Sequence, residues 1–141
     1  MTRRSDGPHR VSHTVTVGGS MTETPEHLHV DFQHAFNRHD LEAIVALYEP
    51  DAVLNAVHGP AQGLVAIRDA YRAFLDSLPI IDLQTLGVTR VGELALLQGK
   101  WTVHRTGLDG GQTSTAGRSV EVVRLQPDGR WLFVIDNPSA V

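Results

Sequence analysis

The feature that most constrains the fold is a pair of strand-like runs near the C-terminal end, joined by a tight turn. Residues 119–126 and 130–136 are rich in β-branched and aromatic side chains, and Pro127-Asp128-Gly129 separates them. This pattern predicts a β-hairpin. Each arm carries one carboxylate in apolar surroundings, Glu121 on the first arm and Asp136 on the second. Because burying an unpaired charge costs free energy, both acids need partners or a function.

The turn decides whether the two acids meet. A two-residue Asp128-Gly129 turn places Glu121 directly opposite Asp136, where the two carboxyl groups would share a proton. A three-residue Pro127-Asp128-Gly129 turn with a bulge pairs Glu121 with Ile135 instead and sends Asp136 to the other face. A further alternative is that Asp136 opens an Asp-Asn-Pro turn and bonds its own backbone.

Length, charge and composition exclude several classes of function. The chain has 141 residues and a net charge of −4, which predicts one globular domain without a nucleic-acid-binding surface. Cysteine is absent, which excludes disulfides and thiolate chemistry and is consistent with a reducing compartment. No apolar run approaches the roughly 20 residues of a membrane span, and the N-terminus lacks the apolar core of a secretory signal. We therefore expect a cytoplasmic protein that binds neither membranes nor nucleic acid.

The chain divides into a tail and one domain. Residues 1–20 are rich in polar residues and glycine and end in Gly18-Gly19-Ser20, so we expect a disordered tail, with the domain spanning residues 21–141. Thr24-Pro25-Glu26 is typical of a helix start, with Thr24 as the N-cap. Asp40 is the expected N-cap of a second helix whose apolar stripe extends to Tyr48. The periodicity of residues 64–78 predicts a third helix.

Strands follow the helices. We expect short strand character at residues 52–57, a turn at Gly59-Pro60, and long strands over residues 80–91 and 93–106 before the terminal hairpin. Helices first and an antiparallel meander afterwards predict an α+β domain with helices on one face of the sheet.

Several local phrases occur in a characteristic order: Thr24-Pro25-Glu26-His27, Phe36-Asn37, residues 40–53, residues 63–68 and residues 121–138. In this order they resemble the SnoaL-like and ketosteroid-isomerase-like proteins of the nuclear transport factor 2-like superfamily, and the closing phrase resembles a bacterial branch of it. The resemblance implies a cone-shaped, curved antiparallel sheet wrapped around the N-terminal helices. It also implies a pocket open at one end and a homodimer formed through the outer face of the sheet.

The resemblance also implies site positions. Steroid isomerases of this superfamily use a carboxylate base, a tyrosine and a protonated acid. The matching positions are Ala56, Phe32 and Glu121, so two of the three groups are missing and true ketosteroid isomerase activity is rejected. Glu121 is implied to point into the cone, where desolvation would favour its neutral, hydrogen-bond-donating form. The alternative is a rim or interface glutamate paired with Arg124 or with another cation. The same placement favours the register that puts Asp136 opposite Glu121.

The strand of residues 98–105 has two faces. The resemblance implies that Gln98, Lys100, Thr102 and His104 face the cone, which makes His104 a candidate general base. Amphipathic alternation predicts the reverse, with Trp101 and Val103 buried and His104 in water.

We therefore expect a small-molecule pocket, with cofactor-free acid–base chemistry on a carbonyl compound as an isomerase, cyclase or lyase. Glu121 is the expected donor and Asp136 or His104 the expected base, and the expected ligand-binding residues are Phe32, Phe36, Ala56, Gln98 and Thr102. A non-catalytic binding or dimerisation module is the alternative. The remaining histidines show no zinc-ligand spacing, and no nucleotide-binding or nucleophile-elbow motif is present, so we expect no metal and no cofactor.

Overall fold

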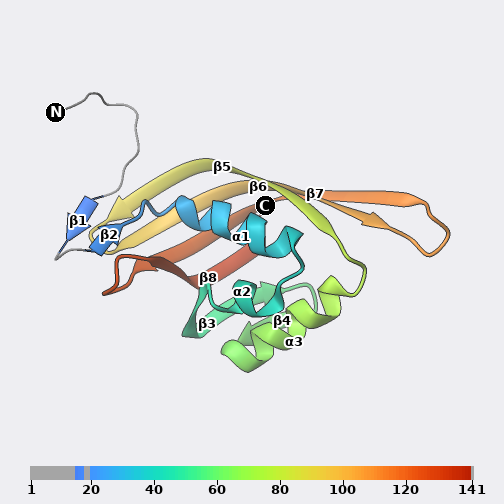
Figure 1. Ribbon diagram of the computed structural model, residues 1–141, viewed down its shortest axis with the longest axis horizontal. Helices are drawn as coiled ribbons and strands as arrows, with labels where there is room; N and C mark the ends of the chain where they lie inside the picture. The colour runs from blue at the N-terminus through green and yellow to red at the C-terminus, as the bar shows by residue number, and fades with distance from the viewer. Residues whose placement is uncertain (1–14, 18–19, 141) are drawn as a thin grey trace.

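The computed structural model describes residues 15–17 and 20–140, and its main feature is a curved six-stranded sheet (Figure 1). The strand order is β4-β3-β8-β7-β6-β5. The strands are β3 (Tyr48–Ala56), β4 (Gly59–Gln62), β5 (Ile80–Val91), β6 (Leu94–Thr106), β7 (Gln112–Leu125) and β8 (Trp131–Ala140). Four of the five neighbouring pairs are antiparallel as expected, but β3 pairs with β8 in parallel, so the sheet is mixed.

Three helices lie on one side of this sheet, which confirms the predicted α+β fold of a curved sheet around N-terminal helices (Figure 1). They are α1 (His27–Asn37), α2 (Leu41–Val45) and α3 (Leu64–Leu75). Asp40 caps α2 as predicted, because its side chain accepts a hydrogen bond from the amide of Ala43 at 3.1 Å. None of these helices combines the length and apolar character needed to cross a membrane.

The start of α1 differs from the prediction. Thr24 is not the N-cap; the amides of His27 and Leu28 bond to the carbonyls of Thr24 and Pro25, which are three residues earlier. These short bonds make residues 24–26 a turn, and the regular helix begins at His27.

The second helix is also shorter than predicted, and the difference matters for the site. It ends at Val45, and Tyr48 is the first residue of β3 rather than part of a helical stripe. Pro50 lies inside β3, where the register with β8 shifts between Tyr48 and Val53. Proline lacks an amide hydrogen, and strands tolerate it at such irregularities. Tyr48 is therefore held by the sheet.

The terminal hairpin combines features of both predicted registers. Gln126 lies opposite Arg130, and their backbone bond of 2.7 Å encloses a three-residue Pro127-Asp128-Gly129 turn. The register then shifts between Val122 and Val123, where β8 has one extra residue, Val134. This β-bulge moves every later residue of β8 by one position, so Glu121 pairs with Asp136 although the turn has three residues.

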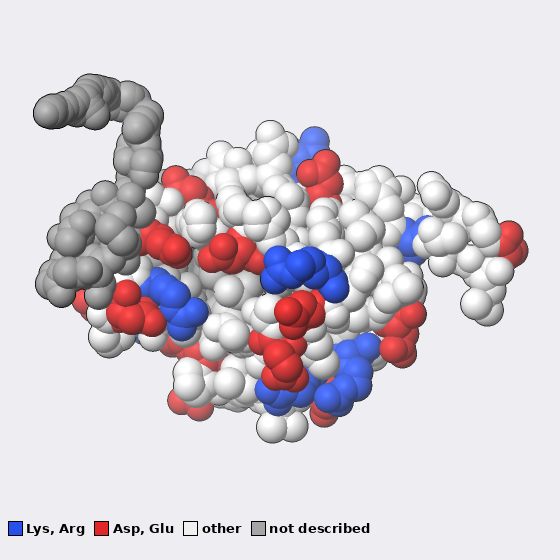
Figure 2. All heavy atoms as spheres, in the orientation of Figure 1, with Lys and Arg blue, Asp and Glu red and all other residues white. Residues whose placement is uncertain are grey.

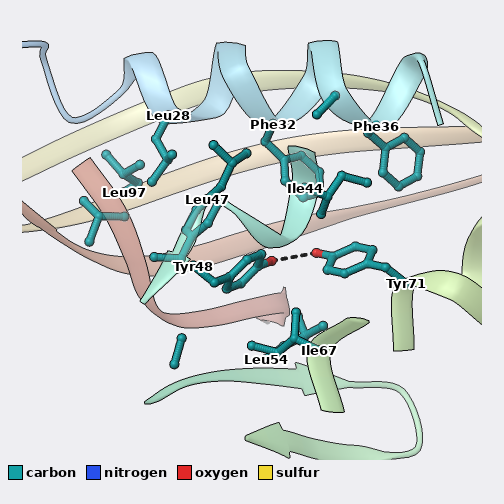
Figure 3. Close-up of a cluster of buried hydrophobic side chains, with 14 of the residues drawn as sticks. Leu28, Phe32, Phe36, Ile44, Leu47, Tyr48, Leu54, Ile67, Tyr71 and Leu97 are labelled. Atoms are coloured by element: carbon teal, nitrogen blue, oxygen red, sulfur yellow. Dashed lines mark hydrogen bonds between the residues drawn. The ribbon is translucent and has the colours of Figure 1, made fainter. Parts of the chain in front are cut away.

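The core fills the space between the sheet and the helices. It contains a cluster of aromatic rings, in which Phe133 of β8 packs at a tilt against Tyr48, with 4.9 Å between centroids, and edge-to-face against Phe32, with 6.1 Å between centroids. Figure 3 shows Phe32 and Phe36 pointing from α1 toward this cluster, and Tyr71 reaching toward Tyr48. Aromatic contacts of this kind bury large apolar areas and fix the distance between the helices and the sheet.

Two features extend beyond the main body. The β6–β7 hairpin projects past the neighbouring strands (Figure 1). Of the predicted N-terminal tail, residues 1–14 and 18–19 lie outside the described residues. In the rest, β1 (Val15–Val17) pairs with β2 (Ser20–Thr22), where the sequence indicated no strand pairing. Over the face drawn in Figure 2, basic and acidic side chains are interspersed.

Candidate functional site

A cavity of about 170 Å³ lies between the inner face of the sheet and helices α1 and α3. Most of its wall is hydrocarbon or aromatic ring. The polar side chains in the wall belong to His29, Tyr71, Ser119, Glu121, Asp136 and Ser139, and the apolar ones to Phe32, Phe36, Leu54, Ala56, Val57, Ala70, Phe74, Ile81, Leu83, Trp101, Val103, Phe133 and Pro138. A cavity that is mostly apolar with a few polar groups is the usual form of a small-molecule site.

Glu121 is held by a histidine from α1. Its Oε1 lies 2.6 Å from Nε2 of His29, and Nδ1 of His29 lies 2.7 Å from Oγ1 of Thr85 on β5. His29 and Glu121 are 2% and 4% exposed, respectively, so this contact is shielded from water. The imidazole ring is fixed at both nitrogens, and it orients one carboxylate oxygen of Glu121.

Asp136 is held by two phenols. Tyr48 donates a hydrogen bond of 2.5 Å to Oδ2 of Asp136, and the hydroxyl of Tyr71 lies 2.6 Å from that of Tyr48. Because the single phenolic proton of Tyr48 goes to Asp136, Tyr71 is the donor to Tyr48. The chain of hydrogen bonds thus runs from α3 through β3 to β8.

Burial changes the acidity of this group of side chains. Desolvation, followed by the negative charge of Glu121, raises the pKa of Asp136 to about 7, and the Tyr48 hydrogen bond only partly opposes this. Desolvation also raises the pKa of Tyr48 and of Tyr71 well above the usual phenol value, with the charge of Asp136 adding to it. Both tyrosines therefore stay neutral, and Asp136 changes charge near neutral pH.

The backbone of the sheet places the two acids together. Leu97, Glu121, Asp136 and Leu54 are paired in succession across β6, β7, β8 and β3. Residues directly opposite each other on neighbouring strands point to the same face, with Cβ atoms roughly 5 Å apart. Glu121 and Asp136 consequently line the same cavity from adjacent strands.

The structure separates the predicted site residues into two groups. Glu121, Asp136, Phe32, Phe36 and Ala56 all line the cavity. Gln98, Thr102 and His104 do not, which corrects the placement that the resemblance implied. His104 is exposed, and its Nδ1 lies 2.8 Å from Oγ of Ser114.

The physical reason is the alternation of β6. Ala95, Leu97, Trp101 and Val103 supply the apolar side chains that the inner face needs, so the even-numbered polar residues face outward, as amphipathic alternation predicted. Trp101 fits across the neighbouring strand because Gly117 has no side chain. A Cβ at position 117 would lie 2.6 Å from the indole ring.

Sequence reasoning missed three residues of the site. His29 was one of four histidines in or beside α1, and only its position on the buried face of the helix distinguishes it. Tyr48 and Tyr71 fitted apolar helical stripes, so nothing in their local pattern indicated a polar role. A tyrosine in a buried stripe needs a partner for its hydroxyl, and that requirement was the available signal.

A separate group of Glu23, His27 and Asp31 has ligand atoms within 4.8 Å of one another, and these residues are exposed or half-buried. None of the three lines the cavity. They form weak contacts along the surface of α1, such as the 3.4 Å approach of His27 to Asp31.

Comparison with known proteins agrees with this arrangement of cavity and sheet. The sequence profile of the SnoaL-like domain matches residues 29–134, which is most of the chain; the match includes His29 and Glu121 and ends two residues before Asp136. The chain belongs to the SnoaL-like family. No functionally curated protein matches this SnoaL-like chain significantly.

Solved structures share the fold at low sequence identity. A ketosteroid isomerase-like protein from Erwinia carotovora atroseptica is 20% identical, with a TM-score of 0.71 over 79% of this chain and 89% of the other. A protein from Streptomyces avermitilis, assigned as a dehydratase of the nuclear transport factor 2-like family, is 17% identical, with a TM-score of 0.72 over 81% and 92%. A protein from Thiobacillus denitrificans is 18% identical, with a TM-score of 0.69 over 85% of this chain and 97% of the other. It is assigned as a calcium/calmodulin-dependent protein kinase type II association domain. At these identities the likeness establishes the nuclear transport factor 2-like fold of this SnoaL-like protein and nothing further.

The raised pKa of Asp136 predicts a pH-dependent stability. The native state keeps this proton up to about pH 7, whereas the unfolded chain releases it near 3.8. The native state therefore binds more protons in this window, and its free energy of unfolding falls as the pH rises through it. We expect wild type to lose stability relative to Asp136→Asn between about pH 5 and pH 7, with little further change above, in urea unfolding. If the difference in free energy of unfolding between wild type and Asp136→Asn stayed constant with pH, it would contradict the raised pKa of Asp136.

The contact of His29 with Glu121 predicts a non-additive pair of substitutions. His29→Leu leaves the Glu121 carboxylate buried without its partner, so we expect a loss of about 3–5 kcal/mol in the free energy of unfolding. The double variant with Glu121→Leu removes that charge and should be more stable than His29→Leu alone. Thr85→Val serves as the control. It removes only the hydroxyl that contacts Nδ1 of His29 and should lower the free energy of unfolding by about 1 kcal/mol. Simple additivity of the two single substitutions would show that the pair does not interact.

Proposed function

We propose that this SnoaL-like protein carries out cofactor-free acid–base chemistry on a small carbonyl compound, as an isomerase, cyclase or lyase. The observation that supports it is the pairing of two carboxyl groups in one apolar cavity with different partners, Glu121 on an imidazole and Asp136 on a phenol. Two carboxyl groups with different environments have different pKa values, so one can act as the acid and the other as the base in proton transfer.

The charges favour Glu121 as the base and Asp136 as the acid. The negative charge of Glu121 is one of the causes that raise the pKa of Asp136 to about 7, so Asp136 is the acid of the pair that keeps its proton up to near-neutral pH. The sequence alone suggested the reverse assignment, with Glu121 as the donor. Among the hydrogen bonds of the described residues, each acid uses one oxygen, Oε1 or Oδ2, which leaves the other for a ligand.

The proposed reaction balances without a cofactor. The carboxylate of Glu121 takes a proton from the carbon next to the carbonyl group, while Asp136 donates a hydrogen bond to the carbonyl oxygen as negative charge develops there. Return of the proton from Glu121 to a different carbon completes an isomerisation. Loss of a leaving group from the enolate, with the proton of Glu121 passing to that group, completes a lyase reaction. Attack of the enolate carbon on a second carbonyl, with the same proton passing to the new alkoxide oxygen, completes a cyclisation.

The cavity differs from the steroid isomerase pattern at two positions. Ala56 and Phe32 line the wall with hydrocarbon where the resemblance places a carboxylate and a tyrosine. The phenols of this protein come instead from β3 and α3, through Tyr48 and Tyr71. This supports a substrate and a proton path different from those of a true ketosteroid isomerase.

Exchange of carbon-bound hydrogen tests this proposal directly. We expect the wild-type protein to accelerate the exchange of the methyl hydrogens of acetophenone in D₂O, followed by loss of the proton NMR signal. Glu121→Gln and Asp136→Asn should each reduce the rate by about 100-fold or more, because each removes one proton-transfer group. His104→Ala is the matched control and should retain the wild-type rate, since His104 lies outside the cavity. Equal rates in wild type, Glu121→Gln and Asp136→Asn would reject catalysis. They would favour the alternative, a non-catalytic binding module.

We further propose that the protein forms a homodimer through the outer face of the sheet. Leu96, Val122, Ile135 and Val53 are paired in succession across β6, β7, β8 and β3, and we call them the outer stripe. Leu96 and Ile135 are 37% and 43% exposed in the single chain. A continuous apolar row on an exposed face is typical of an interface between subunits.

Light scattering after size-exclusion chromatography tests the dimer. We expect wild type to elute with twice the mass of one chain and Ile135→Lys to elute as a monomer, because a charge in the outer stripe would be desolvated in the interface. Val65→Lys on α3 is the control and should remain dimeric, as Val65 is exposed but lies away from the sheet. A monomeric wild type, or a dimeric Ile135→Lys, would reject this interface.

A further inference from the structure

Ser119 is a buried hydroxyl that the proposed chemistry does not use. It lies on β7 two residues before Glu121, is 4% exposed, and lines the same cavity. Its Oγ has no hydrogen-bond partner within the described residues. A buried hydroxyl without a partner destabilises a protein, so such groups call for an explanation in the native structure.

The neighbouring strands leave this hydroxyl open. On one side Ser119 pairs with Gly99, where a Cβ would lie 2.6 Å from the Ser119 Oγ and 3.2 Å from Cε1 of His29. On the other side the register of β7 with β8 shifts between Arg118 and Val120, so Ser119 has no directly paired residue on β8. Glycine at position 99 and this second irregularity together keep space around the hydroxyl.

The rest of the wall limits what Ser119 could bind. The described lining contains two acids and no lysine or arginine, so an anionic ligand would meet no compensating charge. Glu121 already has His29 as its partner and Asp136 has Tyr48, so neither acid is without a partner to pair with an ammonium group. An uncharged ligand fits these constraints best.

Volume limits the size of the ligand. The cavity measures about 170 Å³ and is walled by rings such as Phe32, Phe74, Trp101 and Phe133. An apolar cavity of about 150 Å³ suffices to hold one benzene molecule. A compound built on one ring therefore fills the space.

From these observations we propose that the Ser119 hydroxyl donates a hydrogen bond to the oxygen of an uncharged, single-ring carbonyl compound. The proposal names the substrate class of the cavity and rests on the proposed function for the choice of a carbonyl group. It makes Ser119 a specificity-determining residue, which distinguishes a ketone from a hydrocarbon of the same shape.

Binding of matched probes tests it without any turnover. The probes are acetophenone, α-methylstyrene, in which a CH₂ group replaces the carbonyl oxygen, and benzoate. The indole N–H of Trp101 reports occupancy by NMR, because Trp101 lines the cavity and its Nε1 donates to the carbonyl of Pro138 at 2.7 Å. Asp136→Asn measured in parallel shows whether the probe is in contact with the acid.

We expect Ser119→Ala to weaken acetophenone binding by about threefold to tenfold, the value of one neutral hydrogen bond, and to leave α-methylstyrene binding unchanged. Benzoate should cause no shift of the Trp101 signal at neutral pH. Ser119→Ala should also unfold at the same urea concentration as wild type or a higher one, because it removes an unpaired buried hydroxyl. Ser114→Ala, on the outer face of the same strand, should change neither probe's affinity.

Four results would overturn the proposal. Two concern Ser119→Ala: an equal loss of affinity for both neutral probes, or a clear loss of stability without ligand. The other two concern the wild-type protein: binding of benzoate as tight as that of acetophenone, or failure of acetophenone to bind. Hydrogen exchange separates the two proposals, because Ser119-dependent binding without exchange would reject the acid–base chemistry and keep the assignment of Ser119.

Discussion

The structure depends on how two carboxyl groups are accommodated on neighbouring strands inside an apolar cavity. Two ionised acids at this separation would repel each other and would both lose hydration. The protein resolves this by giving each acid its own partner, His29 for Glu121 and Tyr48 for Asp136, and burial raises the pKa of Asp136 to about 7. These partners come from α1 and β3, and Thr85 on β5 and Tyr71 on α3 support them in turn. Elements from the whole domain therefore converge on this one pair.

A single extra residue in β8 makes the pairing possible. The three-residue turn would place Ile135 opposite Glu121, and alternation would then direct Asp136 outward. Val134 adds one position to β8, so Asp136 moves to the inner face and Ile135 to the outer face. The bulge thus completes both the acid pair in the cavity and the outer stripe. Bulges commonly re-aim side chains next to functional sites, and here the same irregularity acts on both faces of the sheet.

The nuclear transport factor 2-like fold supplies a cavity, and individual side chains decide its chemistry. In this SnoaL-like protein the wall is mostly aromatic and aliphatic, so under the proposed function its few polar groups orient the ligand. His29 and Tyr71 are positioned by hydrogen bonds to other residues, whereas Ser119 has no such partner. The groups with partners hold the two acids in place. The group without one is available to a ligand.

The sequence by itself determined the three helices, the long strands and, through the family resemblance, the inward direction of Glu121. Those features depend on local periodicity, turn residues and a recognisable order of motifs, which are present in the chain before it folds. The sequence showed no sign of β1 and β2 and indicated only a turn where β4 begins. It did not determine the bulge at Val134, the strand position of Tyr48, or the choice of His29 among similar histidines. It also left open which face of β6 points inward, and the implied placement of His104 in the cavity was wrong. Each of these depends on contacts between residues far apart in the chain, such as the 92 positions between His29 and Glu121, and such contacts exist only once the helices pack against the sheet.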